Sequence, residues 1–524
     1  MSLVPGRYIL AIDEGSSSAR AVLVDGDGLI VSEASSPILA THPHPFWVEL
    51  DPTMLWDAAR TSMTAAMAKI GATAADIASV GITTHRESCL IWDRQTGIPV
   101  YNAIMWMSKQ TDDIISQWSL DGLDDDIRRI TGVRNDSYFS AGKLAWILDH
   151  VPGARRDAEA GRLVAGTVDT WLLWNLTGGR SHHTDPSSAS RTAMFDIHTL
   201  SWSADLCARY RIPLQLLPEV LPSNAHFGHV DPSLFAGGGQ HPIPITAILA
   251  DQQAGLYGQA CFEPGTAKNT YGTAGVLTVN VGDAPRIIPG MSSSVAWQDD
   301  SGISYEVEGV VFHSGQTLHW LRDKMRVIDS IEHSGAVAAS LSDNGGVYFV
   351  PAFAGLCDPY WDRDVRGAII GLTLDTGADH IVRAGLEAMA YQTRDNVLAL
   401  ERGGLAISTL RVDGGAIRND FLCQFQADVL GITVERPREL ERTALGVAQL
   451  AGIGVGMWSG TSQLRDSWRA EKVFEPRISL DEREELYAGW QNAVAAARAI
   501  PPVRASHLPP TPAAVPAPDL VAHR

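Results

Sequence analysis

Cysteine is scarce in this chain, and the few cysteines present are not arranged as pairs. The 524 residues contain only five cysteines, and no two of them are spaced as C-x-x-C. Small secreted domains rely on an even, closely spaced set of cysteines for their disulfide bonds, and zinc ribbons use paired C-x-x-C units. The pattern therefore argues against both, and it predicts reduced thiols and a cytoplasmic enzyme.

Long apolar runs and a positive net charge are also missing. No uninterrupted apolar stretch reaches the length needed to cross a bilayer, and no charged segment followed by a short apolar one opens the chain. Lysine and arginine number 41 against 60 aspartates and glutamates, which gives a formal net charge of -19. Because nucleic acids and anionic membranes attract basic proteins, we expect neither as a main partner, although a few local donors can still hold a small anion.

The common nucleotide-binding motifs are absent as well. The chain has no G-x-x-x-x-G-K-[ST] loop, no strand followed by G-x-G-x-x-G and a helix, and no set of eukaryotic protein-kinase motifs. These absences exclude P-loop enzymes, classical dinucleotide folds and eukaryotic protein kinases. They leave open a phosphate site that is built in another way.

What the chain does have, at its beginning, is a hairpin with a small and hydroxylated tip. In "AIDEGSSSARAVLVDGDG" (11–28), an apolar strand runs into Asp13, Gly15 and the serines 16–18 before a second strand begins. Backbone N–H groups and hydroxyls at such a tip are the donors from which phosphate accepts hydrogen bonds. Ordinary turns between antiparallel strands have the same composition, so these residues alone leave both interpretations open.

The rest of the pattern predicts an α/β protein of two similar halves. Strands are expected at 8–12, 19–24 and 29–32 and a helix at 52–70, with strands and helices alternating afterwards. After residue 254 the opening pattern recurs, because "GTAKNTYGTAGVLTVNVGD" again predicts a strand, a hydroxylated turn and a strand. We therefore predict domains at 1–253 and 254–500 that face each other across a cleft. The Pro/Ala-rich segment 501–524 is expected to be disordered.

A third segment, "LRVDGGAIRNDFLCQFQADVLGITVERP" (410–437), predicts a strand, a Gly-Gly turn, a helix and a strand. Its helix places Phe421, Leu422, Phe425 and Val429 on one face, and Gly431 supplies a stop signal. The Gly-Gly turn is a third place at which a nucleotide can be held.

Many phrases, in the correct order over roughly residues 7–500, resemble the FGGY carbohydrate kinases, and among these the glycerol kinases. They include "YILAIDEGSSSARAVLVD", "GITTHRES", "YNAIMWMSKQT", "ADQQAGLYGQ", "AKNTYGT" and "YFVPAFAGLCDPYWDRDVRGAIIGLT". The family's first signature is matched by "YFSAGKLAWILDH", and its second by "GAIIGLTLDTGADHIVRAGLE" apart from Gly385. The resemblance implies an α/β fold of two ribonuclease-H-like domains, as in actin and hexokinase, flanking an ATP cleft. It also implies ATP- and Mg²⁺-dependent phosphorylation of a polyol or sugar.

Carried over by motif, the resemblance assigns the nucleotide and the metal to the two hairpins and the Gly-Gly turn. Asp13 and Asp251 are predicted to hold Mg²⁺, partly through water, because a hard dication that bridges phosphates prefers carboxylate and water oxygens. His319 stands where the family has a glutamine. The residues predicted to bind ATP are Ser16, Ser17, Ser18, Arg20, Gly272, Thr273, Gly315, His319, Gly415 and Asn419.

The polyol is assigned to residues of both the first half and the second hairpin. Asp251 matches the family's general base, since a primary hydroxyl is a poor nucleophile until a carboxylate within hydrogen-bond reach takes its proton. Arg86 and Glu87 match the clamp that donates to and accepts from neighbouring hydroxyls. The residues predicted to contact the substrate are Arg86, Glu87, Trp106, Tyr138, Asp251, Gln252 and Val276.

Several positions around the predicted polyol site depart from the glycerol-kinase pattern. Val276 replaces the family's second aromatic wall, Met107 and His85 stand where glutamine is usual, and a basic pair has become Lys109-Gln110. A valine in place of phenylalanine leaves room for about one more carbon and weakens the apolar contact by very roughly 1 kcal/mol. Glycerol is the favoured substrate. A four- or five-carbon polyol or ketose, such as erythritol, threitol, erythrulose or xylulose, is the alternative.

One further alternative, the oligomeric state and an expected lack of inhibition concern the whole protein. A non-catalytic, actin-like nucleotide-binding protein is a rival from another class, but ATP binding alone needs neither Asp251 nor the Arg86–Glu87 clamp. The family analogy implies a homo-dimer or tetramer. The loop "AGGGQHPIPI" (236–245) lacks the arginine found in fructose-bisphosphate-inhibited bacterial glycerol kinases, so we expect this inhibition to be weak or absent.

Overall fold

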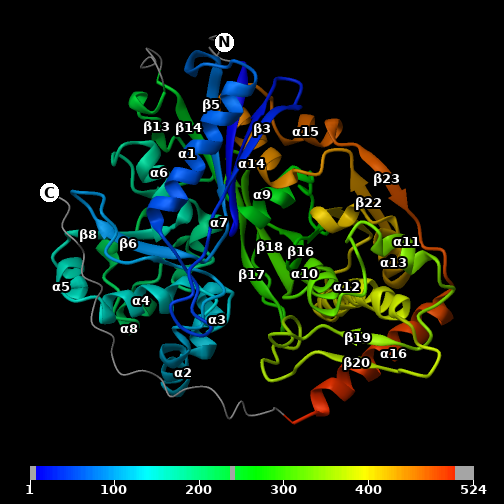
Figure 1. Ribbon diagram of the computed structural model, residues 1–524. Helices are drawn as coiled ribbons and strands as arrows, with labels where there is room; N and C mark the ends of the chain where they lie inside the picture. The colour runs from blue at the N-terminus through cyan, green and yellow to red at the C-terminus, as the bar shows by residue number, and fades with distance from the viewer. Residues whose placement is uncertain (1–6, 236–241, 502–524) are drawn as a thin grey trace.

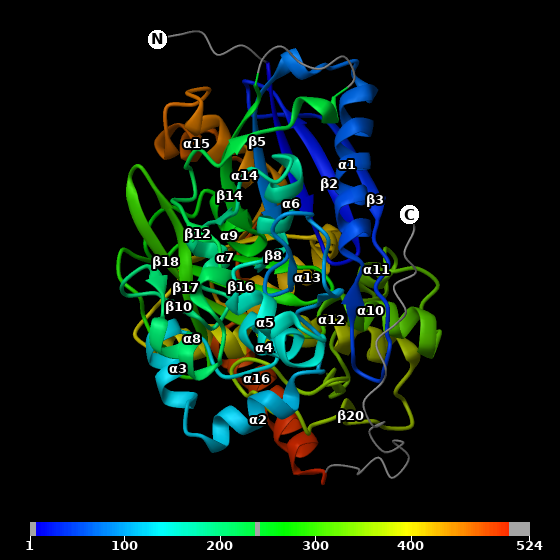
Figure 2. The same ribbon diagram turned by 90° about the vertical axis from the view of Figure 1, so that its left-hand side faces the viewer.

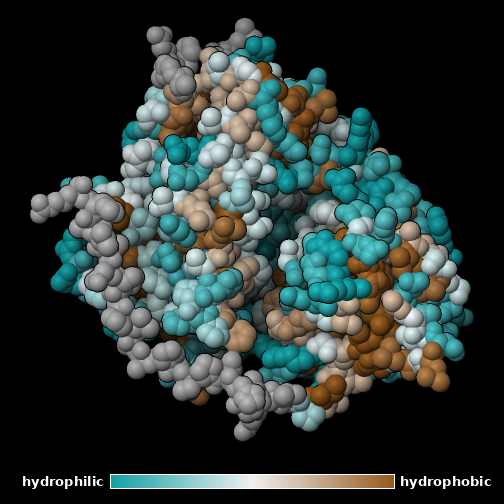
Figure 3. Space-filling view, in the orientation of Figure 1, coloured by the Kyte–Doolittle hydropathy of each residue, from teal (hydrophilic) through white to brown (hydrophobic). Residues whose placement is uncertain are grey.

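Two β-sheets form the centres of the two halves of the molecule, one on the left and one on the right of Figure 1. The structure is a computed structural model, and it describes residues 7–235 and 242–501. The predicted tail beyond residue 501 and positions 236–241 of the glycine-rich loop lie outside the described residues. A hollow lined largely by hydrophilic residues runs between the two halves (Figure 3).

The first sheet is built around the hairpin that opens the chain. Its strands run in the order β13-β14-β5-β1-β2-β3, in which β1, β2 and β3 form an antiparallel meander and β1, β5 and β14 are parallel. Helix α1 packs along β2 and β3 (Figure 2). The bounds are β1 Tyr8–Glu14, β2 Ser18–Val24, β3 Ile30–Pro37, α1 Pro52–Lys69, β5 Ile77–Thr84, β13 Gly228–His229 and β14 Pro244–Ala250.

The second sheet repeats this plan around the second hairpin. Its order is β17-β18-β16-β15-β21-β22-β23, with β15–β16 as the antiparallel hairpin and β15, β21 and β22 parallel. Helix α13 ends at Leu430 and is capped by Gly431, which adopts φ 71° as the predicted stop signal requires. The bounds are β15 Ala267–Tyr271, β16 Gly275–Gly282, β17 Ser292–Asp299, β18 Gly302–Val311, α12 Ala378–Arg402, β21 Thr409–Asp413, α13 Asp420–Leu430, β22 Thr433–Pro437, β23 Ala470–Phe474 and α16 Leu480–Ala499.

Each half contains one helix that packs on the sheet of the other half, an arrangement called the helix exchange below. Helix α9 (Asp251–Gly258) follows β14 of the first sheet but also packs on β15 and β16 of the second. Helix α14 (Arg442–Gly454) follows β22 of the second sheet and packs on β1, β5 and β14 of the first. The two helices cross near the middle of the molecule (Figure 1) in backbone contact, since a Cβ at Gly446 would lie 1.9 Å from the carbonyl oxygen of Ala254.

A four-stranded sheet and several helices form a smaller layer of the first half, at the lower left of Figure 1. The sheet runs β4-β7-β6-β8, and α4 packs on β6. The loops of this layer carry four predicted polyol contacts, namely Arg86, Glu87, Trp106 and Tyr138. The bounds are β4 Glu49–Leu50, β6 Cys89–Asp93, β7 Ala103–Ile104, α2 Asp112–Leu120, α3 Asp124–Thr131, α4 Ser140–His150, α5 Ala154–Glu159, β8 Leu163–Thr167 and α6 Val168–Leu176.

The predicted fold class is confirmed, and the predicted elements occur with small shifts of their ends. The first three strands each begin or end a few residues away from the predicted limits, and the helix expected at 52–70 is α1. The predicted domain boundary at 253/254 falls inside α9 and stays a prediction. Within 7–235 and 242–501, no helix is both long and apolar enough to cross a membrane.

Candidate active site

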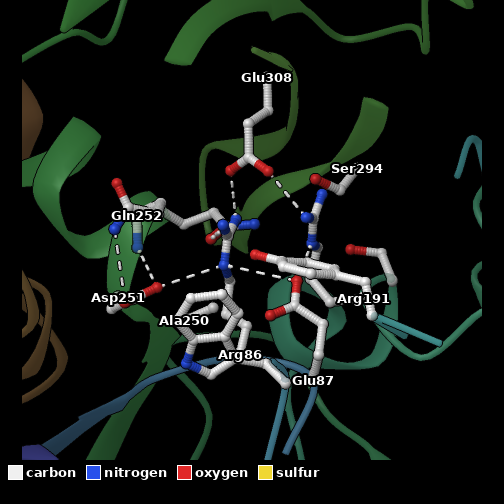
Figure 4. A network of polar contacts seen from close by, with 12 residues as sticks. Arg86, Glu87, Arg191, Ala250, Asp251, Gln252, Ser294 and Glu308 are labelled. Carbon is white, nitrogen blue, oxygen red and sulfur yellow. Dashed lines mark hydrogen bonds and ion pairs between the residues drawn. The ribbon is translucent and has the colours of Figure 1, made fainter. Parts of the chain in front are cut away.

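Arg86 and Glu87 lie in a short loop between β5 and β6, and both side chains are almost completely buried. Glu87 has a φ of 64°, a left-handed conformation that only a minority of side-chain-bearing residues adopt. This conformation turns the chain sharply and sends the two adjacent side chains into the same region between the lobes (Figure 4). The predicted clamp residues are therefore next to each other in space, as the motif implied.

Arg86 is the centre of the polar network drawn in Figure 4. Its Nε lies 3.3 Å from Oδ1 of Asp251, and its Nη1 lies 2.6 Å from Oε2 of Glu308. Asp251 is the first residue of α9, and 26% of its side chain is exposed, whereas Glu308 on β18 is fully buried. The arginine thus connects a partly exposed carboxylate at the cleft to a carboxylate deep in the second half.

Arg191 and Glu308 complete the network from positions that the sequence did not predict. Arg191 follows α7 (Pro186–Ala189), and it donates from Nε to Glu87 and from Nη2 to Glu308, each at 2.7 Å. Burial alone would raise the pKa of Glu308, but the guanidinium groups of Arg191 and Arg86 bring it below its ordinary value. The two arginines and the two glutamates are thereby held in fixed positions.

A third buried carboxyl group, Glu306, lies beside this network. Burial and the negative charge of Glu308 raise the pKa of Glu306 to about 7. Glu306 and Glu308 alternate along β18, so both point to the same face of the strand. Two acids at alternating positions in "ISYEVEGVVF" are a sequence signal for inward-facing charges, and this signal could have identified them.

Gln252 is fixed by contacts on both sides. Its backbone N–H donates to Oδ1 of Asp251 at 2.7 Å, and its side-chain amide nitrogen lies 3.4 Å from Oδ2 of the same residue. On the other side, the ammonium group of Lys268 donates to the Gln252 side-chain oxygen and, at 2.7 Å, to the hydroxyl of Thr270. Lys268 is fully buried on β15, and burial lowers its pKa. Sequence reasoning missed this lysine.

Asp13 is the last residue but one of β1, half-buried and within electrostatic range of Asp251. Burial and the negative charge of Asp251 raise the pKa of Asp13 to about 7, although Arg20 acts in the opposite direction. Among the described residues there is no group of three or more His, Cys, Asp and Glu side chains that could hold a metal by itself. Two carboxylates fit Mg²⁺, which usually takes one or two protein carboxylates and completes its shell with phosphate and water oxygens.

The first hairpin brings its serines to the edge of the predicted polyol site. The hydroxyl of Ser16 accepts a hydrogen bond of 2.8 Å from the indole N–H of Trp106, while Ser17 at the tip is exposed. Arg20 forms an ion pair with Glu441, which directly precedes α14. Ser16 therefore lies between the two predicted sites, and Arg20 connects the two halves.

The second hairpin, the start of α10 (Gly315–Trp320) and the Gly-Gly turn are in backbone contact with one another. The N–H of Gly315 donates to the carbonyl oxygen of Gly272 at 2.9 Å, and Thr273 at the tip is exposed. Gly414 has a φ of 92°, and a Cβ there would lie 2.6 Å from the carbonyl oxygen of Tyr271. A Cβ at the exposed Gly415 would meet nothing within 4 Å, so this residue borders open space.

Asn419 and His319, the two remaining predicted ATP contacts, both have contacts within the protein. Asn419 caps α13 by accepting from the backbone N–H of Leu422 at 3.2 Å, and its amide donates to Ser334 at 3.2 Å. His319 is exposed on α10, with its Nδ1 3.3 Å from a guanidinium nitrogen of Arg322. The nucleotide roles of both residues stay predictions.

The apolar part of the predicted polyol site is formed by aromatic and small side chains. The rings of Trp106 and Tyr138 meet edge to face, with centroids 5.6 Å apart. Val276 is only 8% exposed, because it is packed with Val310 and Cys357, and the side chains of Phe312 and Trp361 lie against this cluster. Aromatic surface is therefore present near Val276, although that residue itself is aliphatic.

Comparisons with known proteins agree with this architecture. Residues 8–258 match the model of the N-terminal domain of the FGGY family of carbohydrate kinases, and residues 267–455 match that of its C-terminal domain. A glycerol kinase of Symbiobacterium thermophilum is 46% identical over 495 residues, covering 94% of this chain and 98% of the relative. A glycerol kinase of Stenotrophomonas maltophilia is 48% identical over 492 residues, with the same coverage.

Solved structures give the same result. The crystal structure of Plasmodium falciparum glycerol kinase with ADP aligns with a TM-score of 0.87 and 32% identity, covering 94% of this chain and 98% of that one. A gluconate kinase from Lactobacillus acidophilus, at 21% identity and a TM-score of 0.83, shares the fold. With both domain models matched in order and close relatives spanning nearly all of its length, the chain belongs to the FGGY family of carbohydrate kinases.

Proposed function

We propose that the protein transfers the γ-phosphoryl group of ATP to a terminal hydroxyl of glycerol and so forms glycerol 3-phosphate. The observation that carries this proposal is the 3.3 Å contact between Arg86 and Asp251, which joins the predicted polyol clamp to the predicted base. The name glycerol kinase, carried by the relatives at 46–48% identity, supports the choice of substrate.

Asp251 is the group suited to accept the proton of the attacking hydroxyl. It is partly exposed, so a substrate can reach it, and Arg86 and the N–H of Gln252 hold its carboxylate in one orientation. A carboxylate in hydrogen-bond reach removes the proton as the hydroxyl attacks phosphorus, and a fixed orientation lowers the entropic part of the barrier.

Arg86 and Glu87 are suited to bind the other hydroxyls. A guanidinium donates and a carboxylate accepts, so the pair matches neighbouring hydroxyl groups. Arg191 donates to Glu87, and Glu308 forms an ion pair with Arg86, so both side chains of the clamp are held in place. The exposed side of Trp106 offers an apolar surface to the C–H face of the polyol.

The tips of the two hairpins are suited to bind the phosphates of ATP. Ser17 and Thr273 are exposed at these tips, and the turn at Gly415 borders open space for the adenosine end. The relative from Plasmodium falciparum was solved with ADP, which supports a nucleotide in this cleft. Asp13 and Asp251 would hold Mg²⁺, which neutralises phosphate charge when it is bound.

A coupled ADP-release assay tests the proposal. The panel consists of glycerol, dihydroxyacetone, erythritol, threitol, erythrulose and xylulose, each with ATP and Mg²⁺. We expect glycerol to give the highest kcat/KM or to share it with one four-carbon compound. A kcat/KM for glycerol well below that of the five-carbon xylulose would show that the substrate is a larger sugar. ADP release with none of the compounds would favour a non-catalytic nucleotide-binding protein.

A cytoplasmic location and a homo-oligomeric state complete the proposal. All five cysteines are free and buried, as in a protein that keeps reduced thiols. Size-exclusion chromatography with light scattering would distinguish the expected dimer or tetramer from a monomer.

A further inference from the structure

We propose that the polyol pocket continues past Val276 to a hydroxyl-binding position formed by Arg134 and Asp358, and that the enzyme phosphorylates four-carbon polyols in addition to glycerol. This inference rests on the proposed kinase function. It uses two residues from different lobes that the predicted site does not contain.

Asp358 is attached to the wall of the predicted pocket by the backbone of β18. Its Oδ2 accepts from the N–H of Val310 at 2.8 Å, and Val310 lies opposite Val276 in the β16–β18 pairing. Glu308, which touches Arg86, stands two residues before Val310 on the same strand and points to the same face. Burial raises the pKa of Asp358 to about 7 against the effect of Arg134, and the charge of Glu308 contributes to the rise.

Arg134 approaches the same place from the first half. It belongs to the loop between α3 and α4 that also carries Tyr138, and its guanidinium stacks on the ring of Trp361 at 4.2 Å. Trp361 in turn donates its indole N–H to Asp358. Residues of both halves of the molecule thus meet around the carboxylate of Asp358, directly beside the cluster that contains Val276.

The donors of Arg134 are not satisfied by the protein. Its Nη2 lies 3.6 Å from Oδ1 of Asp358, which is too long for a hydrogen bond. Both Nε and Nη2 are covered from solvent, yet neither has an acceptor in hydrogen-bonding range among the described residues. The Arg134 side chain as a whole is 22% exposed and borders accessible space, whereas the Asp358 side chain behind it is fully buried. A buried donor without an acceptor is costly, and a ligand atom that accepts from Arg134 removes this cost.

The chemistry of the pair selects a neutral hydroxyl. Arginine only donates and an ionised carboxylate only accepts, whereas a hydroxyl does both and can therefore bridge the two groups. A carboxylate or phosphate at the same position would be repelled by Asp358 and by the nearby Glu308. A polyol with one more hydroxyl-bearing carbon than glycerol therefore fits, and a sugar acid does not.

The test is the ratio of kcat/KM for a tetritol to kcat/KM for glycerol, measured with meso-erythritol and with threitol in the coupled ADP-release assay. Both values come from the same preparation, so an inactive fraction cancels in the ratio. We expect at least one tetritol to lie within about tenfold of glycerol in the unmodified enzyme. Arg134→Met should lower the ratio by about tenfold, because one hydrogen bond to a charged donor is lost. Val276→Phe should also lower it, since the larger ring occupies the path to the pair.

The matched control is Arg129→Met, which makes the same change at an exposed arginine paired with Asp126 on α3. It should leave the ratio unchanged. If neither glycerol nor a tetritol is phosphorylated, the proposed function fails and this inference fails with it. If glycerol is phosphorylated but no tetritol is, or if Arg134→Met leaves the ratio unchanged, only this inference is wrong. The pair is then an inter-lobe contact without a role in specificity.

Discussion

The carboxylate of Asp251 is partly exposed and is also held in one orientation by Arg86 and the N–H of Gln252. Asp251→Asn keeps the size of the side chain and removes its ability to accept a proton. We expect phosphoryl transfer to fall by roughly 100-fold to 10,000-fold, the usual contribution of a general base. Binding of ATP without Mg²⁺, followed by titration calorimetry, should change little, because the exposed hairpin tips are unaltered. Near-normal turnover in this variant would rule out the base assignment.

Lys268 controls the orientation of Gln252 because it donates to the side-chain oxygen of that residue. With the oxygen held by the ammonium group, the amide NH₂ points toward Asp251 and the predicted polyol site. Lys268→Met should raise KM for glycerol by about tenfold and affect kcat less, since ground-state contacts are lost. Thr270→Val is the control, because it removes the other acceptor of Lys268 and leaves the Gln252 contact. Equal effects of both variants on KM would contradict the orienting role.

Sequence reasoning reached some members of the polar network and not others, for a physical reason. Arg86, Glu87 and Asp251 stand in short phrases whose resemblance carries a role, and the structure brings the three together. Arg191 and Glu308 contact the side chains of Glu87 and Arg86, and these contacts join segments that are more than a hundred positions apart in the sequence. Such pairing is set by the tertiary fold, and no local spacing reveals it. The chemical roles of all these residues stay predictions.

At the scale of elements, the crossing of α9 and α14 leaves no room for a side chain. Gly446→Ala places a methyl group 1.9 Å from the Ala254 carbonyl oxygen. Since the obstacle is backbone, the helices must separate, and we expect a loss of stability of about 3 kcal/mol or more. Gly26→Ala is the matched control, because a Cβ there meets nothing within 4 Å. Equal melting temperatures of the two variants would show that the crossing adapts easily.

The contact between α12 and α16 provides a pH-dependent test. Asp395 on α12 accepts from the Tyr487 hydroxyl at 2.6 Å and from the Trp490 indole N–H at 2.9 Å, and burial raises its pKa from 3.8 to about 6. An acid whose pKa is higher in the folded than in the unfolded state contributes least to the free energy of unfolding when it is ionised. Stability is therefore lost as the pH rises from about 4 through 6, by up to roughly 3 kcal/mol.

Asparagine at this position cannot ionise, so Asp395→Asn separates the titration from the packing. The melting temperature of the variant minus that of the unmodified protein should increase between about pH 4 and pH 7. Differential scanning fluorimetry across this interval measures it. A constant difference would mean that folding does not raise the pKa of Asp395.

The elements differ in how well the sequence predicts them. The hairpins and the third segment were predicted because alternation, turn residues and a helix stop are local signals, and the structure confirms them. The exchange of α9 and α14 was not predicted. Helix α9 has few apolar residues at helical spacing and contains two glycines, and its partner lies far along the chain.

At the scale of the whole molecule, neither sheet is covered by its own half alone. Helix α14 packs on β1, β5 and β14, so residues 1–258 without the second half expose that face of the sheet. We expect this fragment to bind a hydrophobic dye and to lack a cooperative thermal transition. Adding residues 259–524 by coexpression should restore both properties. A monomeric fragment 1–258 that unfolds cooperatively would show that the first half is independent.

The helix exchange also determines how such proteins can be recombined. A chimera made by joining the first half of one family member to the second half of another combines an α9 and an α14 from different parents. Because these helices touch through backbone at Gly258 and Gly446, a single larger residue in either parent obstructs the crossing. The segments that must be inherited together are therefore α9 and α14 with the strands that precede them. A breakpoint at the apparent middle of the chain separates the two helices that most need a common origin.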